Sequence, residues 1–220
     1  MKILAISDQE IPAIYSPRIR EHFGDVDIII GCGDLPYYYL EFVLTTLNVP
    51  LYYVPGNHDQ QQLMSDGRVV SYAEGGIEID GRVAHQDGLI LAGLGGSMRY
   101  RPNSHNQHTE YEMRWRALKL VPRLVLNRLI RERYLDILLT HAPANGIHDL
   151  PDRAHNGFRT FNWFMTRFRP RFLLHGHVHN YRRDKPRRTW YKQTEVINVH
   201  PYKLIEWERE TLASPGKHQR

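Results

Sequence analysis

The chain has 220 residues, a formal net charge of +5 and one cysteine. This length fits one domain with a core of its own, and a single cysteine excludes an internal disulfide and favours a reducing compartment. The apolar run after Lys2 is too short for a signal-peptide core or a membrane span, so we expect a cytoplasmic protein with no membrane partner. We expect one domain over residues 1–210 and a frayed polar tail over 211–220.

The N-terminal quarter alternates between short apolar runs and helical patterns. We expect strands over residues 3–7, 26–30 and 51–54 and helices over 17–23 and 36–47. Ser16 followed by Pro17 is typical of a helix N-terminus. Strand–helix–strand repeats at this spacing predict right-handed crossovers and a parallel sheet.

The pattern changes after residue 74. Short alternating runs over residues 75–94, with Asp80 and Gly81 between them, predict an antiparallel hairpin. Residues 95–108 contain two adjacent glycines, Pro102 and several polar residues, which predicts a long irregular loop of the kind that often carries function.

A helix is predicted after this loop. Thr109 and Glu112 have the spacing of a capping box, which marks a helix N-terminus. We expect Trp115 and Leu118 to face the core, and Pro122 to kink or restart the helix.

The remaining elements follow the same alternation. We expect the helix to end near residue 131, a strand over 136–140, an aromatic core-facing helix over 158–168, a strand over 172–175 and two closing strands within 189–207. Cys32, at the end of the second predicted strand, is expected to be a buried packing residue.

Side chains that can bind a metal follow five of the predicted apolar strands. These are Asp8 and Glu10, then Asp34, then Asn57 with His58 and Asp59, then His141, and finally His177 and His179. The carboxyl ends of strands in an open α/β sheet are where ligands bind. Any one of these groups alone is typical of a surface turn or a structural histidine. Together they predict a centre of two metal ions that share a carboxylate.

The order of these motifs resembles the calcineurin-like metallophosphoesterase family. The blocks read "SDQE", "GCGD", "PGNHD", "THAP" and "HGHVH", and the resemblance spans residues 3 to about 200. The first block departs from the family pattern, because Glu10 stands where the family usually has histidine. The resemblance implies a four-layered α/β sandwich with two central mixed β-sheets flanked by helices.

The resemblance also implies a role for each residue. The first metal would be held by Asp8, Glu10, Asp34 and His179, and the second by Asp34, Asn57, His141 and His177. His58 would reach the scissile phosphate and protonate the leaving oxygen, and Asp59 would orient His58. The implied activity is hydrolysis of a phosphomonoester or phosphodiester by in-line attack of a metal-bridging hydroxide.

Glu10 bears on the identity of the metal. With Glu10 as a ligand, the first site would have three carboxylates and one imidazole, and oxygen-rich ligation favours manganese or magnesium. We expect two divalent ions, with manganese first and iron, zinc or magnesium as alternatives. Strand alternation favours ligation by Glu10. In the other interpretation Glu10 points away and the first site is incomplete.

Other residues are candidates for substrate contacts. Arg99 is predicted either to clamp a phosphate or to lie in solvent as a loop arginine. His148 and His155 follow His141 and are predicted to contact substrate. The basic residues Arg182, Arg183, Lys185, Arg187 and Arg188 either line the rim of the site or form a solvated turn.

Three functions remain open on the sequence. The first is a phosphoesterase for a small phosphorylated substrate. The second is a nuclease that uses the basic segment 181–192, but that segment lacks interleaved aromatic platforms, so a nucleic-acid partner is not favoured. The third is a non-catalytic metal-binding interaction scaffold, which the presence of His58 and Asp59 argues against. The sequence leaves the natural substrate and the oligomeric state open.

Overall fold

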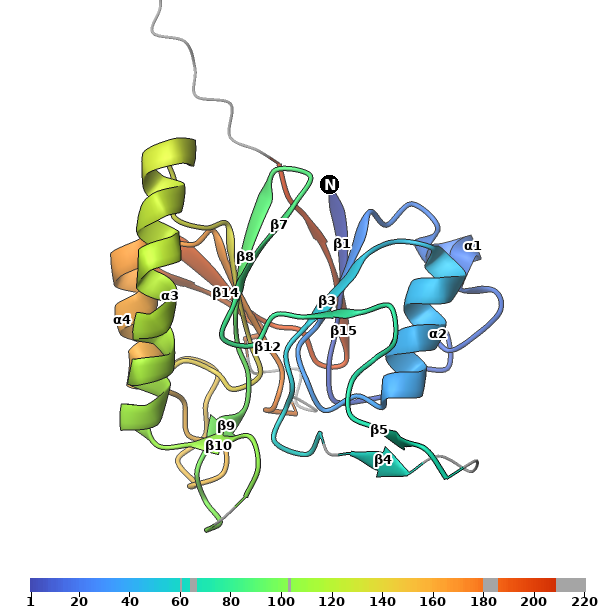
Figure 1. The fold of residues 1–220 in the computed structure, drawn as a ribbon, viewed down its shortest axis with the longest axis horizontal. Helices are drawn as coiled ribbons and strands as arrows, with labels where there is room; N and C mark the ends of the chain where they lie inside the picture. Colours follow the sequence, from blue (N-terminus) through green and yellow to red (C-terminus); the bar gives the residue numbers. More distant parts are fainter. Residues whose placement is uncertain (60, 64–66, 103, 180–185, 209–220) are drawn as a thin grey trace, which may run out of the picture.

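The computed structural model describes residues 1–59, 61–63, 67–102, 104–179 and 186–208, and the predicted tail over 211–220 lies outside them. Two mixed β-sheets pack face to face, and helices cover the outer face of each (Figure 1). This is the four-layered α/β sandwich that the family resemblance implies. None of the described helices is long and apolar enough to span a bilayer.

The first sheet carries the N-terminal strands. Its strand order is β15-β1-β2-β3-β6, with β15 antiparallel to β1 and the other pairs parallel. The strands are β1 (Lys2–Ile6), β2 (Ile28–Gly31), β3 (Leu51–Tyr53), β6 (Ile77–Glu78) and β15 (Tyr202–Glu206). Ile3 and Ala5 of β1 face the second sheet, whereas Leu4 and Ile6 face the helices. Burial on both faces explains why this strand is a continuous apolar run.

The second sheet has the order β13-β14-β12-β11-β8-β7, with antiparallel pairs at its two edges. Its strands are β7 (Val83–Gln86), β8 (Leu89–Leu94), β11 (Ile137–Thr140), β12 (Phe172–His175), β13 (Arg188–Tyr191) and β14 (Thr194–Asn198). Ile137, Leu139 and Leu174 pack against the first sheet and, with Ile3 and Ile28, form the core between the sheets. Because the parallel strands of both sheets end at one edge, their following loops converge there.

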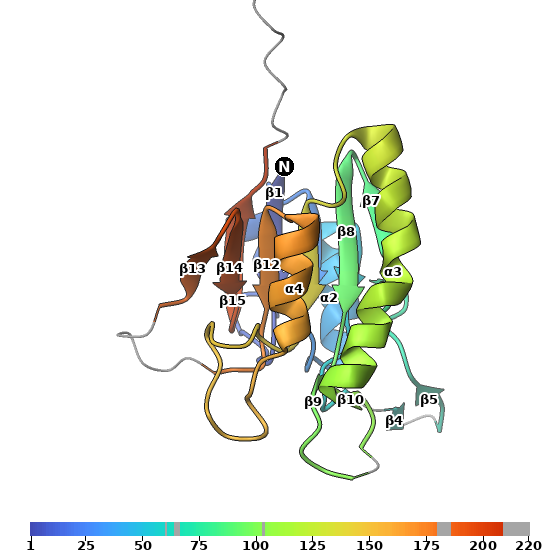
Figure 2. The same ribbon diagram turned by 90° about the vertical axis from the view of Figure 1, so that its left-hand side faces the viewer.

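The outer layers are helical. The helices α1 (Ile19–Phe23) and α2 (Tyr37–Leu47) cover the first sheet (Figure 1), and α3 (Glu110–Arg131) and α4 (Arg159–Phe168) cover the second (Figures 1 and 2). The aromatic stripe of α4 is buried, as predicted, with Phe161 and Phe164 fully inaccessible. Two short pairs lie outside the main sheets: β4 (Gln62–Leu63) with β5 (Val69–Val70), and β9 (Ser97–Met98) with β10 (Gln107–His108).

Several local predictions are wrong. The first helix begins at Ile19, and Ser16 is not its N-cap. The antiparallel hairpin pairs β7 with β8, and its turn lies at Asp87 and Gly88 rather than at Asp80 and Gly81. Asp87 and Gly88 both have positive φ, of 47° and 87°, which is what a two-residue hairpin turn requires. The C-terminal segment forms three strands, β13, β14 and β15, instead of two.

The long helix α3 also differs from the prediction. The capping box of Thr109 and Glu112 is present, as predicted. The helix is continuous through Pro122, so the proline does not restart it. Trp115 and Leu118 do not face the core, because 52% and 36% of their surfaces are exposed. The core-facing residues are instead Met113, Ala117, Leu120 and Leu124.

Candidate metal centre

The predicted ligands come together at the carboxyl edge of the two sheets. Asp8 follows β1, Asp34 follows β2, Asn57 follows β3, His141 follows β11, and His177 and His179 follow β12. Asp8, Asp34 and His177 adopt left-handed backbone conformations, with φ of 64°, 56° and 64°. Such conformations are costly for residues other than glycine and occur often at functional sites.

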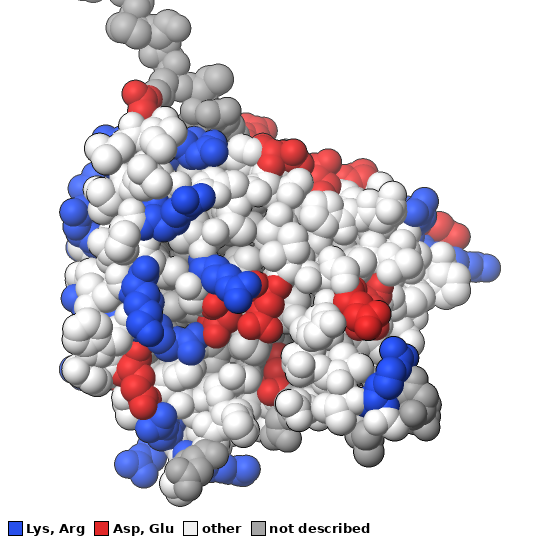
Figure 3. Space-filling model, in the orientation of Figure 1, with Lys and Arg blue, Asp and Glu red and all other residues white. Residues whose placement is uncertain are grey.

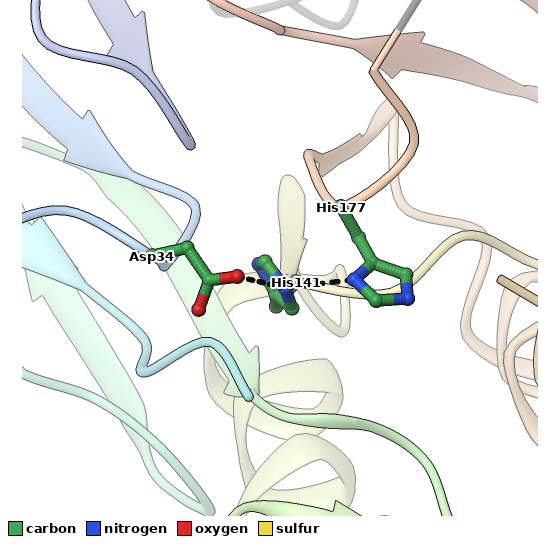
Figure 4. Close-up of side chains that lie close together, drawn as sticks. All are labelled: Asp34, His141 and His177. Atoms are coloured by element: carbon green, nitrogen blue, oxygen red, sulfur yellow. Dashed lines mark hydrogen bonds and ion pairs between the residues drawn. The ribbon is translucent and has the colours of Figure 1, made fainter. Parts of the chain in front are cut away.

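Four of these residues form what we call the inner centre: Asp34, Asn57, His141 and His177. Polar side-chain atoms of the other three lie close to Nε2 of His141. The Nε2 atom of His141 lies 3.0 Å from Oδ1 of Asn57, 3.3 Å from Oδ2 of Asp34 and 3.1 Å from Nδ1 of His177. Figure 4 shows the carboxylate and both imidazoles directed at one another. Ligand atoms of Asp34, His141 and His177 all lie within 4.8 Å of one another, a spacing that one cation can bridge.

Backbone carbonyls fix the tautomers of both imidazoles. Nδ1 of His141 donates to the carbonyl oxygen of Cys32 at 2.8 Å, and Nε2 of His177 donates to that of Ala154 at 2.7 Å. A carbonyl oxygen only accepts, so these nitrogens carry the hydrogens. The opposite nitrogens, which point at each other, are therefore the ones that can bind a metal, that of His141 after it has given up its proton.

The charge balance of the inner centre calls for a cation. Burial opposes protonation of His141, but the neighbouring Asp34 carboxylate raises the pKa of this imidazole to about 10. Burial, followed by the nearby His141, lowers the pKa of His177 to about 4. Around Nε2 of His141 lie two oxygens and one ring nitrogen, all of which can accept. One proton cannot form hydrogen bonds to all three of these atoms at once. A divalent ion can bind all of them together, because each has a lone pair to offer to a metal. The donor set therefore fits a metal.

Close packing holds Asp34 in place. The backbone N–H of His58 donates to Oδ1 of Asp34 at 2.8 Å. Burial disfavours the charged carboxylate, but the His141 imidazole beside it keeps the pKa of Asp34 below its ordinary value. A Cβ atom on Gly56 would overlap Oδ1 of Asp34, which explains the glycine of the "PGNHD" block.

The other predicted ligands form what we call the outer centre: Asp8, Glu10 and His179. The Asp8 carboxylate accepts hydrogen bonds from Ser7 Oγ and from the backbone N–H of His177. Nε2 of His179 lies 3.4 Å from Oδ1 of Asp8, and this contact raises the pKa of His179. The Asp8 side chain is buried, whereas 44% of the His179 side chain is exposed. The ring of His179 stacks on His200 at a centroid distance of 4.6 Å.

Glu10 has a different partner. The hydroxyl of Tyr38, on α2, donates to Oε1 of Glu10 at 2.5 Å. This hydrogen bond, with some help from burial, raises the pKa of Tyr38 to about 12. The Glu10 carboxylate is therefore bound to Tyr38 of α2 in this structure. Ligation of a metal by Glu10 stays a prediction.

His58 and Asp59 lie at the inner centre. The His58 side chain is exposed at the sheet edge, and its backbone N–H binds Asp34. The carboxylate of Asp59 accepts from the backbone N–H groups of Asp34 and Gly56, at 3.0 Å and 2.8 Å. Burial and then the Asp34 charge raise the pKa of Asp59 to about 6. These hydrogen bonds fix the loop that carries Asp34, and an orienting effect of Asp59 on His58 stays a prediction.

The three candidate substrate residues have partners within the protein. The Arg99 guanidinium binds Glu112 at 2.8 Å. Both ring nitrogens of His148 are hydrogen-bonded, one to His175 at 3.0 Å and the other to Thr189 at 2.8 Å. The ring of His155 binds Asp152 and lies 5.2 Å from that of His177, at the inner centre. Substrate contacts by Arg99, His148 and His155 stay predictions.

The predicted basic rim is only partly described. Arg182, Arg183 and Lys185 lie outside the described residues. Arg187 donates to the carbonyl oxygen of His200 at 2.9 Å, and Arg188 pairs with Glu195 at 2.6 Å. These two arginines support the fold around β13 and β14.

Tyr100 is a site residue that the sequence did not reveal. Its hydroxyl oxygen accepts from Nδ2 of Asn57 at 3.3 Å, which leaves Oδ1 of Asn57 directed at His141. Gln107 holds the Tyr100 segment through a hydrogen bond to the Tyr100 backbone N–H. The available signal was the position of Tyr100 in the irregular loop 95–108, in which the sequence pattern indicated Arg99 but not Tyr100.

The chain is similar to known proteins. Residues 1–181 match the family described as calcineurin-like phosphoesterase. The chain belongs to this family. An uncharacterized protein of Methanocaldococcus jannaschii, MJ1162, is 26% identical over 194 residues, which cover 83% of this chain and 82% of that protein.

Solved structures show the same fold. The crystal structure of TT1561 of Thermus thermophilus has a TM-score of 0.58 at 14% identity, over 90% of this chain and 88% of that chain. Another crystal structure has a TM-score of 0.63 at 15% identity, over 94% of this chain and 99% of that chain. At such identities the likeness establishes the fold alone.

Proposed function

We propose that the protein is a binuclear-metal-dependent phosphoesterase that hydrolyses a phosphomonoester or phosphodiester of a small molecule. The observation that carries this proposal is the inner centre, where two oriented imidazoles, an amide oxygen and a carboxylate face one point. Membership of the calcineurin-like phosphoesterase family supports the reaction class.

The inner centre would hold one ion, and the outer centre with Asp34 would hold the other, with Glu10 as a ligand once it leaves Tyr38. We propose manganese as the preferred ion, because the outer centre is rich in carboxylates. Divalent ions, when bound, neutralise the charge of the phosphoryl oxygens and lower the pKa of metal-bound water toward neutrality.

The protein's own residues supply orientation and a proton. The carbonyls of Cys32 and Ala154 set the ring orientations of His141 and His177. The backbone N–H of His58 binds Asp34, and the His58 side chain is exposed. These observations support a role in which its imidazole contacts the phosphate and gives a proton to the leaving oxygen. The Asp59 carboxylate holds this loop in place by accepting hydrogen bonds from the backbone N–H groups of Asp34 and Gly56.

A metal-screened activity panel tests the proposal. We expect manganese-stimulated hydrolysis of p-nitrophenyl phosphate or bis(p-nitrophenyl) phosphate. His58→Ala should lower kcat by about 100-fold or more, as expected for loss of a general acid, while metal content stays unchanged. A folded, metal-loaded protein that hydrolyses neither compound would favour a non-catalytic scaffold. Cleavage of single-stranded DNA in preference to both compounds would favour a nuclease.

A further inference from the structure

The helix α3 has two apolar faces. One face, with Met113, Ala117, Leu120 and Leu124, packs into the core. The opposite face is exposed, and its apolar residues are separated mainly by three, four or seven positions, which aligns them along one side of a helix. We call it the outer stripe, and it consists of Tyr111, Trp115, Leu118, Val125, Leu126, Leu129 and Ile130.

The outer stripe is long and accessible. Exposure reaches 70% for Tyr111 at one end and 76% and 69% for Leu129 and Ile130 at the other. A 22-residue helix is about 33 Å long at a rise of 1.5 Å per residue. Both views place α3 on the outside of the molecule (Figures 1 and 2). Apolar side chains gathered along one exposed surface mark an interaction site.

Basic residues line the outer stripe on both sides. At helical spacing, Lys119 and Arg123 lie on one flank and Arg114 and Arg128 on the other. Arg114 also stacks on the Trp163 ring of α4 at 3.4 Å, and Arg128 donates to the carbonyl oxygen of Glu132. Figure 3 shows Lys and Arg side chains gathered on the side of the molecule where α3 lies.

The acids of this helix are mostly engaged. The Glu110 carboxylate accepts from the backbone N–H groups at the start of α4, and Glu112 pairs with Arg99. Glu132, at the C-terminal cap, is exposed. Positive charge therefore dominates the edges of the outer stripe.

The charge pattern distinguishes between possible occupants. If a second copy packed on the outer stripe about a two-fold axis, basic flanks would face basic flanks in either helix direction, and like charges oppose such pairing. A nucleic acid would match the charge but would not bury Leu129 and Ile130. An anionic lipid surface matches both features, because it takes up apolar and aromatic side chains and attracts Lys and Arg beside them.

We propose that α3 docks on the surface of an anionic lipid bilayer through the outer stripe. Trp115, Leu129 and Ile130 enter the boundary between headgroups and acyl chains, and the basic flanks contact the headgroups. The axis of α3 then lies in the plane of the bilayer surface. This docking is independent of the proposed phosphoesterase activity, because none of these side chains belongs to the inner or outer centre.

Vesicle co-sedimentation of the purified full-length protein tests the proposal. We expect binding to phosphatidylcholine vesicles that contain phosphatidylglycerol, weakening as salt rises, and much weaker binding to pure phosphatidylcholine vesicles. Trp115→Ser, and the double variant Leu129→Ser with Ile130→Ser, should each lower the affinity by about tenfold or more, since both remove apolar area that enters the bilayer. Because these side chains are exposed, the variants should keep the wild-type circular dichroism spectrum and metal content.

The matched control is Trp190→Ser. Trp190 is 62% exposed, close to the 52% of Trp115. It lies on β13, the edge strand of the second sheet opposite to β7. This variant should bind vesicles like the wild type. Equal losses in the Trp115 and Trp190 variants, or no preference for anionic vesicles, would overturn the proposal. A dimer in light scattering that the outer-stripe variants dissociate, without vesicle binding by the wild type, would overturn it in favour of a second copy.

Discussion

The inner and outer centres lie at one sheet edge, but their side chains are held in different ways. In the inner centre, His141 and His177 each have one ring nitrogen tied to a backbone carbonyl, and their other nitrogens meet at 3.1 Å. In the outer centre, Glu10 is bound to Tyr38 and the His179 side chain is 44% exposed. The inner centre is therefore arranged for a metal in advance, whereas in the outer centre Glu10 would have to leave Tyr38 before it could bind one.

This difference predicts unequal metal affinities. A preorganised site loses little conformational entropy when it binds a metal, whereas Glu10, as a ligand, would first have to give up a charge-assisted hydrogen bond. We therefore expect the inner centre to bind the first ion more tightly, and the outer centre to bind the second more weakly and with greater sensitivity to nearby substitutions.

The largest expected effect comes from His141→Ala. It removes the residue around which the inner centre is built, so we expect the tighter metal-binding event to weaken by more than about 100-fold and phosphoesterase turnover to fall with it. Elemental analysis after dialysis measures the bound metal. His22→Ala, on the exposed surface of α1, is the control and should leave both quantities unchanged. Full metal retention in the His141 variant would refute the assignment of the inner centre.

A smaller effect is expected from Glu10→Gln. If Glu10 joins the outer centre when metal binds, this substitution should weaken only the second binding event, by about 10- to 100-fold. A manganese titration followed by isothermal calorimetry separates the two events. An unchanged second event would show that Glu10 remains with Tyr38 and that the outer centre binds without it.

Tyr38→Phe should act in the opposite direction. Loss of the hydroxyl frees Glu10 from its hydrogen bond, so the second binding event should become about three- to tenfold tighter. The same titration measures this change. A weaker second event in Tyr38→Phe would mean that Tyr38 supports the ligand geometry instead of competing with it.

The smallest effect is expected from Tyr100→Phe. Nδ2 of Asn57 loses its acceptor, so the amide is oriented less firmly, and we expect the first binding event to weaken by about threefold. Because the Tyr100 hydroxyl binds Asn57 of the inner centre, the second event should keep its affinity. A change confined to the second event would contradict the role assigned to Tyr100.

The sequence predicted the convergence of the inner centre because its signals are local and strong. Apolar runs end in Asp34, Asn57 and His141, and parallel strands bring such ends to one edge. The orientation of Glu10 was not predictable by strand alternation. Asp8 has a φ of 64°, so the backbone turns before Glu10 and the alternation of the strand no longer applies.

The orientation of α3 was not predictable for a different reason. Its sequence carries two apolar stripes at the same helical spacing, and Trp115 and Leu118 belong to the one that faces outward. A hydrophobic pattern alone does not say which stripe meets the sheet, because that depends on tertiary packing against α4 and β8. The hairpin turn was misplaced in the same way, since Asp80-Gly81 and Asp87-Gly88 carry the same turn signal.

The central claim is that two unequal metal centres share one sheet edge, and a manganese titration of the metal-free protein tests it most directly. We predict two resolved binding events per chain, of which His141→Ala abolishes the tighter and Glu10→Gln weakens only the looser. A single binding event that survives His141→Ala, or two events that both substitutions weaken equally, would contradict the account.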